Sequence, residues 1–321
     1  MISTPMSDSE RATTAMPAKP DVAEMTDAAG AHTWGAVVGV DGSPGSAHAL
    51  RWAARRTGQF GPVRPVLTWQ YPYWAVPGMD PVTPAALFDR CLEAARREAG
   101  VAVADIAPDL RAATEVIYGA AGPTLVERSA DANALVVGSR NHGAAIDTMI
   151  GSVGGHVARH ARVPVIVVPE RAHLDNIHGR IVVGVDGSPN AVEALSWALT
   201  HAPAGAAVEA VYVWSCAVPF VGPSYVIPIE SSADDARASL DRTIAAARIA
   251  AGTDREVTTI LDYGDDPRTL LRTRSLDADL LVLGARGRTG VQHLLLGSVT
   301  TSLLHQPTVA TVVVPGDRAG A

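Results

Sequence analysis

The sequence predicts an α/β fold with two tandem doubly wound domains, each a five-stranded parallel sheet flanked by helices. Short aliphatic runs alternate with longer segments of helical periodicity, a pattern typical of buried parallel strands and crossover helices. The segment Val-Gly-Val-Asp-Gly-Ser-Pro occurs twice, with its acidic residue at Asp41 and again at Asp186. A glycine-rich segment follows the fourth aliphatic run of each half, at residues 138–153 and 284–299. These observations together indicate a duplicated domain.

The repeat sets the expected domain boundaries. Residues 33–169 and 180–315 form the two domains, and residues 170–179 form the linker. Residues 1–32 are rich in Ser, Thr, Ala, Pro and acidic residues without periodicity, which predicts a disordered tail. Residues 316–321 form a short second tail. A repeat of this length is a whole-domain duplication and not a solenoid unit.

The two halves share one order of elements, β-α-β-α-β-α-β-α-β. The first strands end at Val40 and Val185, and each leads into a helix that begins with a Ser-Pro pair. The later strands are expected at residues 63–69, 113–118, 134–137 and 163–168, and at 208–214, 256–261, 280–283 and 308–314. The later helices are expected at residues 85–106, 124–130 and 152–161, and at 231–251, 267–275 and 298–305. Proline-rich loops at residues 71–84 and 216–228 follow the second strands.

Composition and charge exclude several classes of function. The net charge is −7 and no long basic run occurs, so nucleic acid is not an expected partner. Cys91 and Cys216 lack the close spacing of a disulfide framework or a zinc site, which suits a reducing cytoplasm. No apolar run reaches about 18 residues, and the N-terminus has no apolar signal core. The expectation is a cytoplasmic protein with no membrane span.

The candidate site lies where the first and fourth strands of each domain end. Ligands of open parallel sheets bind outside the carboxyl ends of the strands, near the point where strand order reverses. An aspartate there could hold ribose hydroxyls or a phosphate-bound metal, while glycine lets the backbone approach a ligand and a helix N-terminus attracts phosphate. Arg286 and Arg288 add charge-assisted bonds. The residues predict a nucleotide site; the competing interpretation is that Asp-Gly-Ser-Pro is only a turn and helix cap.

These motifs resemble the universal stress protein family, in the tandem form of actinobacteria. The pattern is Val-Gly-Val-Asp-Gly-Ser combined with Gly-x-x-Gly, nine residues and Gly-Ser, and its better copy runs from Gly284 to Val299. The resemblance covers about residues 33–169 and 180–315. It implies strand order 3-2-1-4-5 in each domain and binding of ATP. Mg²⁺ bound through the phosphates is a further candidate.

The resemblance also assigns roles to residues. Asp41 and Asp186 would contact the ribose and phosphate side of the nucleotide. The residues that would lie against the adenosine part of the nucleotide are Gly39, Val40, Thr68, Gly184, Val185 and Val213. The implied phosphate contacts are Gly138, Gly151, Ser152, Val153, Gly284, Gly287, Gly297, Ser298 and Val299, and the neighbouring candidates are Arg140, Asn141, His142, Arg286 and Arg288.

The first domain departs from the family pattern at Asn141, where the motif has glycine. Asn tolerates left-handed φ better than most residues, but its side chain would crowd a phosphate. His142 stands where the second domain has Arg288, so fixed positive charge also falls. The sequence therefore predicts tighter ATP binding in the second domain.

No catalytic constellation is predicted. The only lysine, Lys19, lies in the tail, so no phosphate-binding loop of the Gly-x-x-x-x-Gly-Lys type exists. His160 and His305 fall near the ends of predicted helices, where capping is favoured over catalysis. The leading hypothesis is an ATP-binding regulator in a stress, hypoxia or dormancy response, acting on a protein partner that the sequence does not identify. The alternatives are a slow Mg-dependent ATPase, with Asp186 orienting water, and a nucleotide-free scaffold.

The final strand of each domain is aliphatic throughout. An exposed apolar edge invites pairing with another strand. The simplest arrangement pairs the two final strands, so that the domains form an intramolecular pseudo-dimer, and the family resemblance implies the same. A homodimer of whole chains is a further expectation.

Overall fold

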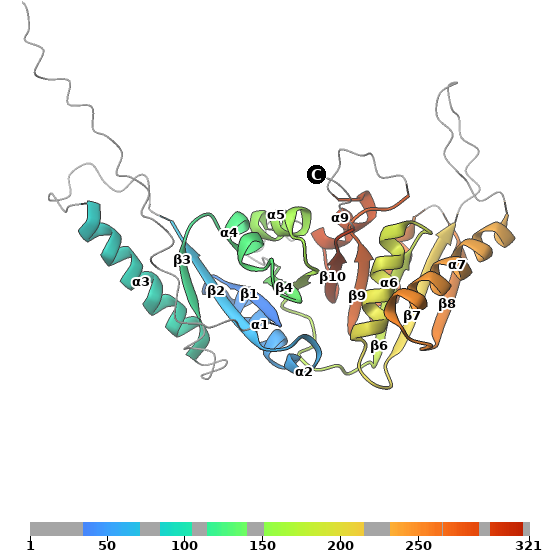
Figure 1. The fold of residues 1–321 in the computed structure, drawn as a ribbon, viewed down its shortest axis with the longest axis horizontal. Coiled ribbons are helices and arrows are strands. Elements are labelled where there is room, and N and C mark those ends of the chain that lie inside the picture. The colour runs from blue at the N-terminus through green and yellow to red at the C-terminus, as the bar shows by residue number, and fades with distance from the viewer. Residues whose placement is uncertain are drawn as a thin grey trace, which may run out of the picture.

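A single ten-stranded sheet runs through both domains (Figure 1). The structure is a computed structural model and describes residues 35–70, 84–104, 114–139, 151–214, 232–264, 266–288 and 296–316. The predictions for residues 1–32, for most of the two proline-rich loops, and for Arg140, Asn141 and His142 lie outside these residues.

The first domain contains five strands and five helices among its described residues, in this order: β1 (Ala36–Val40), α1 (Pro44–Ala54), α2 (Thr57–Phe60), β2 (Val63–Trp69), α3 (Pro84–Ala104), β3 (Glu115–Tyr118), α4 (Ala121–Arg128), β4 (Ala134–Gly138), α5 (Ser152–His160) and β5 (Val165–Val168). The second domain follows with β6 (Arg180–Val185), α6 (Pro189–His201), β7 (Ala207–Trp214), α7 (Ala233–Ala251), β8 (Val257–Tyr263), α8 (Pro267–Ser275), β9 (Leu280–Gly284), α9 (Ser298–His305) and β10 (Ala310–Val314). The predicted α/β architecture is confirmed.

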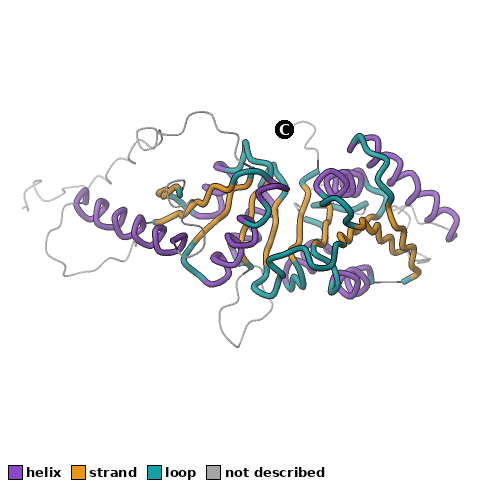
Figure 2. Tube along the Cα trace, turned by 90° about the horizontal axis from the view of Figure 1, so that it is seen from below, coloured by secondary structure: helices purple, strands orange, loops and turns teal. Residues whose placement is uncertain are grey.

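The strand order is β3-β2-β1-β4-β5-β10-β9-β6-β7-β8. Pairs within each domain are parallel, and helices cover both faces of the sheet (Figure 2). In each domain the chain runs outward from the central strand, β1 or β6, through the next two strands and then returns to the other side of that strand at β4 or β9. The strand order therefore reverses between β1 and β4 and between β6 and β9. The carboxyl ends of β1 and β4, and of β6 and β9, therefore meet at two equivalent places.

The two domains join through their final strands. β5 and β10 pair antiparallel, with Ile166 opposite Val312, which is the edge pairing expected from their aliphatic sequences. All residues of both strands are buried. Because β5 and β10 are each half of this junction, neither is an exposed edge of the sheet.

Several boundaries differ from those predicted. The short helix α2 was not predicted, because four residues are too few to show a helical period; its Phe60 is buried and anchors it. The final strands begin at Val165 and Ala310, two residues later than predicted, and β5 starts directly after Pro164, which has no N–H to donate. α4 begins at Ala121, three residues earlier than predicted, because Pro123 is tolerated in a first helical turn.

An aromatic stack crosses the domain boundary on the α1 and α6 side of the sheet. Phe60 of the first domain lies between Trp52, at 5.8 Å between ring centroids, and Trp197 of the second domain, at 6.1 Å. His201 stacks on Trp197 at 4.5 Å with an interplanar angle of 17°. The Arg56 guanidinium lies 4.0 Å from the Trp52 ring centroid and donates to the carbonyl oxygen of Leu174 in the linker. Junction and linker are thus packed together.

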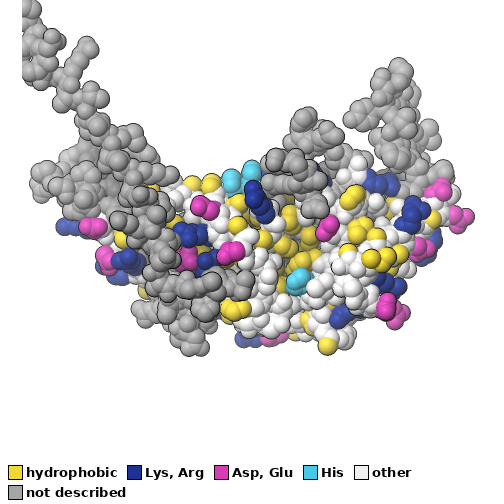
Figure 3. Space-filling model, in the orientation of Figure 1, with side chains coloured by type: hydrophobic (Ala, Val, Ile, Leu, Met, Phe, Trp, Pro, Cys, Tyr) yellow, Lys and Arg dark blue, Asp and Glu magenta, His cyan; other side chains and the backbone are white. Residues whose placement is uncertain are grey.

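A second apolar cluster lies on the opposite face and also contains residues of both domains. Val157 of α5 is buried in it together with Ala285, Leu296 and Leu304 of the second domain, and Val153 packs against it. In the space-filling view, hydrophobic side chains gather on the surface between the two domains (Figure 3). The helices α5 and α9, which follow the two glycine segments, are therefore in the same apolar environment.

We expect folding stability to fall in acid partly through His201. Burial lowers the pKa of His201, while the bond from its ring to the carbonyl of Trp197 partly opposes that shift. The folded protein then favours neutral imidazole, and the unfolded chain binds the extra proton, so stability is present above the ordinary pKa of about 6.5 and decreases as pH falls through it. Urea unfolding at pH 7.5 and pH 5.5 should show a smaller pH effect for His201→Phe than for the unchanged protein. Equal pH effects in both proteins would contradict this assignment.

Candidate functional site

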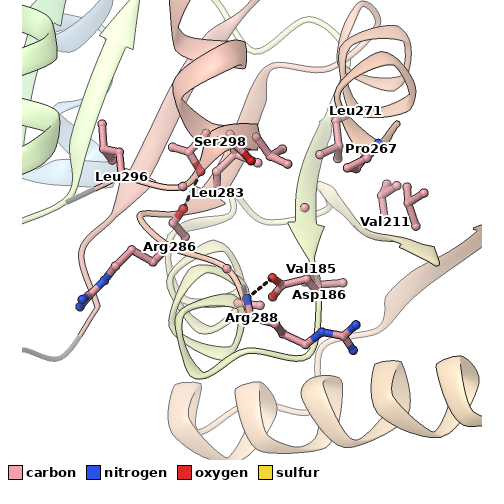
Figure 4. Close-up of a pocket in the computed structure, with 18 residues that line it drawn as sticks. Val185, Asp186, Val211, Pro267, Leu271, Leu283, Arg286, Arg288, Leu296 and Ser298 are labelled. Carbon is pink, nitrogen blue, oxygen red and sulfur yellow. Dashed lines mark hydrogen bonds between the residues drawn. The ribbon is translucent and has the colours of Figure 1, made fainter. Parts of the chain in front are cut away.

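A cavity of about 320 Å³ opens in the second domain where β6 and β9 end (Figure 4). It lies at the point where the strand order reverses, which is the position at which open α/β sheets bind ligands. Every second-domain residue that the sequence analysis selected lines it: Gly184, Val185, Asp186, Val213, Gly284, Arg286, Gly287, Arg288, Gly297, Ser298 and Val299. The tertiary structure brings together residues from positions 184 to 299.

Asp186 faces the glycine loop directly. Its Oδ2 accepts a hydrogen bond from the backbone N–H of Arg288 at 2.8 Å, and its Oδ1 accepts one from the N–H of Ser188 at 3.0 Å. A Cβ atom at Gly287 would lie 2.5 Å from Asp186 Oδ2, so only glycine permits this approach. The loop after β9 is therefore tied to the end of β6 through one carboxylate.

Tyr212 of β7 supports the glycine loop through a hydrogen bond to Arg288. Its ring is 1% exposed, and its hydroxyl accepts a bond from Arg288 Nη1 at 3.0 Å. In Figure 4 the side chain of Arg288 passes beside Asp186, whereas Arg286 extends away from it. Gly187 has φ +79°, and a Cβ there would lie 2.5 Å from Ser239 Oγ, so the turn after Asp186 is also held closely. Tyr212 was not selected from the sequence, where the available signal was a hydroxyl-bearing side chain within a mainly apolar strand.

The helices of the domain begin in two different ways. Ser188 caps α6 by accepting from the N–H of Ala191 at 3.2 Å. At α9 the N-cap is Gly297, and no side chain caps it. The first turn of a helix has backbone N–H groups without intrahelical partners and carries a partial positive charge. At α9 these donors line the cavity, whereas at α6 a serine satisfies one of them.

The remaining walls of the cavity are apolar except at Thr300. They include seven residues that the sequence analysis did not select: Ala191, Val211, Pro267, Leu271, Leu283, Leu296 and Thr300. Thr300 donates from Oγ1 to the carbonyl of Gly284 at 2.8 Å, which ties α9 to the end of β9. Next to Pro267, Asp266 caps α8, and a bond from the Arg268 side chain lowers the pKa of that carboxyl to about 2. The site combines an apolar slot with a polar rim of loop and helix N–H groups.

The first domain has a smaller counterpart of about 130 Å³. Of the selected residues, those lining it are Gly39, Val40, Asp41, Thr68, Gly138, Gly151 and Val153. Ser152 begins α5 but does not line this cavity, and Arg140, Asn141 and His142 are not among the residues that the structure describes. The walls also contain eight residues that were not selected: Ser43, Ser46, Val66, Ala121, Leu125, Val137, Ser139 and Gly154.

The two sites differ in their described polar contacts. Asp41 accepts from the N–H of Ser43 at 3.0 Å and also from the Ser43 hydroxyl, and it is exposed, whereas Asp186 is half-buried. In the strand pairing, Leu67 occupies the register position of Tyr212, so the first domain has no hydroxyl at that place. The second site is the larger and carries the additional tyrosine–arginine support.

Two features are absent from the part of the chain that the structure describes. No group of three or more His, Cys, Asp or Glu side chains is placed to hold a metal ion in those ranges. Within the same ranges, no helix combines the length and apolar character needed to cross a bilayer.

Comparison with known proteins gives consistent matches. The sequence model of the Universal stress protein family matches residues 36–169 and 178–315. The chain is 31% identical over 314 residues to Universal stress protein Rv1996 of Mycobacterium tuberculosis, covering 89% of this chain and 96% of that protein. A universal stress protein of Mycolicibacterium smegmatis is 30% identical over 311 residues, covering 88% and 97%.

Solved structures share the fold over most of the chain. A universal stress protein of Archaeoglobus fulgidus superimposes with a TM-score of 0.61 at 17% identity, covering 87% of this chain and 97% of the other. A putative universal stress protein of Pseudomonas aeruginosa gives a TM-score of 0.55 at 14% identity, covering 88% and 93%. At these identities the likeness concerns the fold alone.

We expect Gly287→Ala to release the loop from Asp186. The added Cβ overlaps Asp186 Oδ2, so the bond from the Arg288 N–H lengthens or breaks. Hydrogen exchange of the Arg288 amide should accelerate by about tenfold or more, as expected when a charge-assisted bond is lost. Gly58→Ala is the matched control, because nothing lies within 4 Å of the Cβ position at Gly58. Unchanged exchange at Arg288 in Gly287→Ala would contradict the role given to Asp186.

Proposed function

The chain belongs to the universal stress protein family, and on that premise we propose that its second-domain cavity binds ATP and that the protein acts as a nucleotide-dependent regulator. The observation that carries the proposal is the pairing of Asp186 with the glycine loop at the strand-order reversal. A carboxylate, a loop of close-approaching glycines and an uncapped helix start converge there on an apolar slot. This combination suits a ligand that has a flat base, a sugar and phosphates.

Each part of the cavity suits one part of ATP. The apolar side chains of Val185, Val213 and Leu271 would hold the adenine ring. The carboxylate of Asp186 would accept hydrogen bonds from ribose hydroxyls. The N–H groups of Ser298 and Val299 at the start of α9 would donate to phosphate oxygens, where the helix dipole favours negative charge. Mg²⁺, where present, would be carried on the phosphates.

The first-domain cavity is proposed as the weaker site. Its volume of about 130 Å³ falls below the 300–1,000 Å³ that is usual for small-molecule sites, while the second cavity lies within that range. It also lacks the tyrosine that supports Arg288 in the second domain. One firmly bound nucleotide per chain follows as the expected state.

The site is better suited to holding ATP than to splitting it. Asp186 already accepts from the N–H groups of Arg288 and Ser188, so it is a poor candidate for a base that activates water. The proposed role is therefore binding, in which ATP stabilises one arrangement of the loops around the site and a protein partner recognises that arrangement. Stress, hypoxia or dormancy in the cytoplasm is the proposed setting.

Asp186→Ala tests the proposed ribose contact. Loss of a charge-assisted bond of about 1.5–3 kcal/mol should raise the Kd for ATP by about 10- to 100-fold in calorimetry. Asp41→Ala is the matched control, since it changes the equivalent carboxylate of the first domain and should leave the main site intact. Tighter binding at the first site, or equal losses in both variants, would contradict the ranking of the two sites.

The nucleotide itself can be identified directly. Mass spectrometry of the supernatant after denaturing the purified protein should detect intact ATP, and added ATP should raise the melting temperature. Steady release of ADP with Mg²⁺, abolished by Asp186→Asn, would instead establish the slow ATPase. No bound nucleotide and no thermal shift would leave the nucleotide-free scaffold as the remaining interpretation.

A further inference from the structure

Two histidines lie ring to ring on α5, outside both cavities. His156 and His160 are four residues apart on one helix, their ring centroids are 4.2 Å apart and their planes differ by 21°. Side chains four residues apart share a helix face, and an i, i+4 histidine pair is a recurrent arrangement for binding a transition metal. From the sequence, His160 is expected near the end of a helix, and no metal ligand is predicted.

The two rings are prepared for that role. The Nδ1 atom of His160 lies 2.8 Å from the carbonyl oxygen of His156, a bond in which the ring nitrogen is the donor. This bond fixes the tautomer and leaves the Nε2 lone pair of His160 for a ligand, as the second-shell partners of metal-bound histidines do. No described residue hydrogen-bonds to the His156 ring.

The fold makes room for the His156 ring at one glycine. A Cβ atom at Gly122 of α4 would lie 2.7 Å from His156 Cγ and Cδ2, so the ring rests on the bare backbone of α4. It is thereby held between α4 and the ring of His160. Burial, followed by the neighbouring His160 and Arg159, lowers the pKa of His156.

The duplicated domain shows that the fold does not need this pair. Counting from the Gly-Ser at the start of each helix, Ser302 and Gln306 occupy the positions of His156 and His160. Counting from the leucines Leu125 and Leu271, which line the two cavities, Arg268 occupies the position of Gly122. Both histidines and the glycine that accommodates them are thus confined to the first domain.

We propose that His156 and His160 form a binding site for a divalent transition-metal ion of the class that prefers imidazole, such as Zn²⁺, Ni²⁺ or Cu²⁺. At a metal–nitrogen distance of about 2.0–2.1 Å, tetrahedral geometry requires the two nitrogens to be about 3.4 Å apart. The ring centroids are 4.2 Å apart and the ring planes are nearly parallel, so both side chains would have to rotate to direct their nitrogen lone pairs at one ion. Water completes the coordination. The nearest described cation, Arg159, directs its Nη1 to the carbonyl of Gly155 at 2.9 Å.

Calorimetry with ZnCl₂ tests the site in the full-length, nucleotide-free protein. His156→Gln and His160→Gln should each weaken one Zn²⁺ site by about tenfold or more, since each removes one of only two protein ligands. The double change His173→Gln/His178→Gln is the matched control, because these rings are also close, at 5.6 Å, but meet edge to face at 74°. It should leave that site unchanged. Asp41 and Asp186 stay in place, so the result is independent of the proposed nucleotide function.

A second measurement needs no variant and so does not depend on how a variant folds. Substoichiometric Cu²⁺ added to the unchanged protein should broaden the NMR signals of the His156 and His160 rings together, before those of the other histidines. Identical Zn²⁺ isotherms for the unchanged protein and both glutamine variants would overturn the proposal. Earlier broadening at other histidines would overturn it as well.

Discussion

The antiparallel pairing of β5 with β10 is the constraint on which the rest of the structure depends. Both strands are aliphatic and buried along their whole length, so neither could remain an open edge in water. Pairing satisfies the backbone groups of both strands and converts two five-stranded sheets into one of ten strands. The outer edges of the combined sheet are β3 and β8, whose residues are mostly half-buried or exposed.

This junction also fixes where the two sites lie. The glycine segments follow β4 and β9, the neighbours of the paired strands, so the helices after them, α5 and α9, pack beside the junction. Leu296, which lines the second cavity, and Val153, which lines the first, belong to the same apolar environment. On the other face, the stack of Trp52, Phe60 and Trp197 closes the boundary. The domains form one packed unit and not two bodies on a flexible linker.

The two duplicated domains share one fold but differ in the side chains that line their sites. The second domain keeps a half-buried aspartate tied to its glycine loop and supported through Arg288 by a buried tyrosine. The first domain has leucine in the place of that tyrosine and a cavity less than half as large. It has instead a histidine pair that the second domain lacks. Because the backbone plan is the same, each difference can be assigned to particular side chains.

The sequence alone determined the architecture and selected eleven of the residues that line the second cavity. Aliphatic runs of strand length, Ser-Pro helix starts and two copies of Asp-Gly-Ser-Pro are local signals, and they placed Asp186 and the glycine loop correctly at the ends of their strands. The same signals located nearly all the helices and strands, with errors of a few residues where a proline or an uncapped turn decides the boundary.

Only the tertiary structure decided what these residues touch. The apolar wall of the second cavity comes from several separate elements, and no spacing within one segment shows that Leu271 of α8 and Val211 of β7 line it together. Tyr212 and Arg288 are 76 residues apart along the chain and meet only because β7 lies beside β6 and the loop folds over both. The histidine pair required both a helix and the bare backbone of Gly122 on the next one. Local patterns specify elements, whereas contacts between elements depend on how the sheet brings distant side chains together.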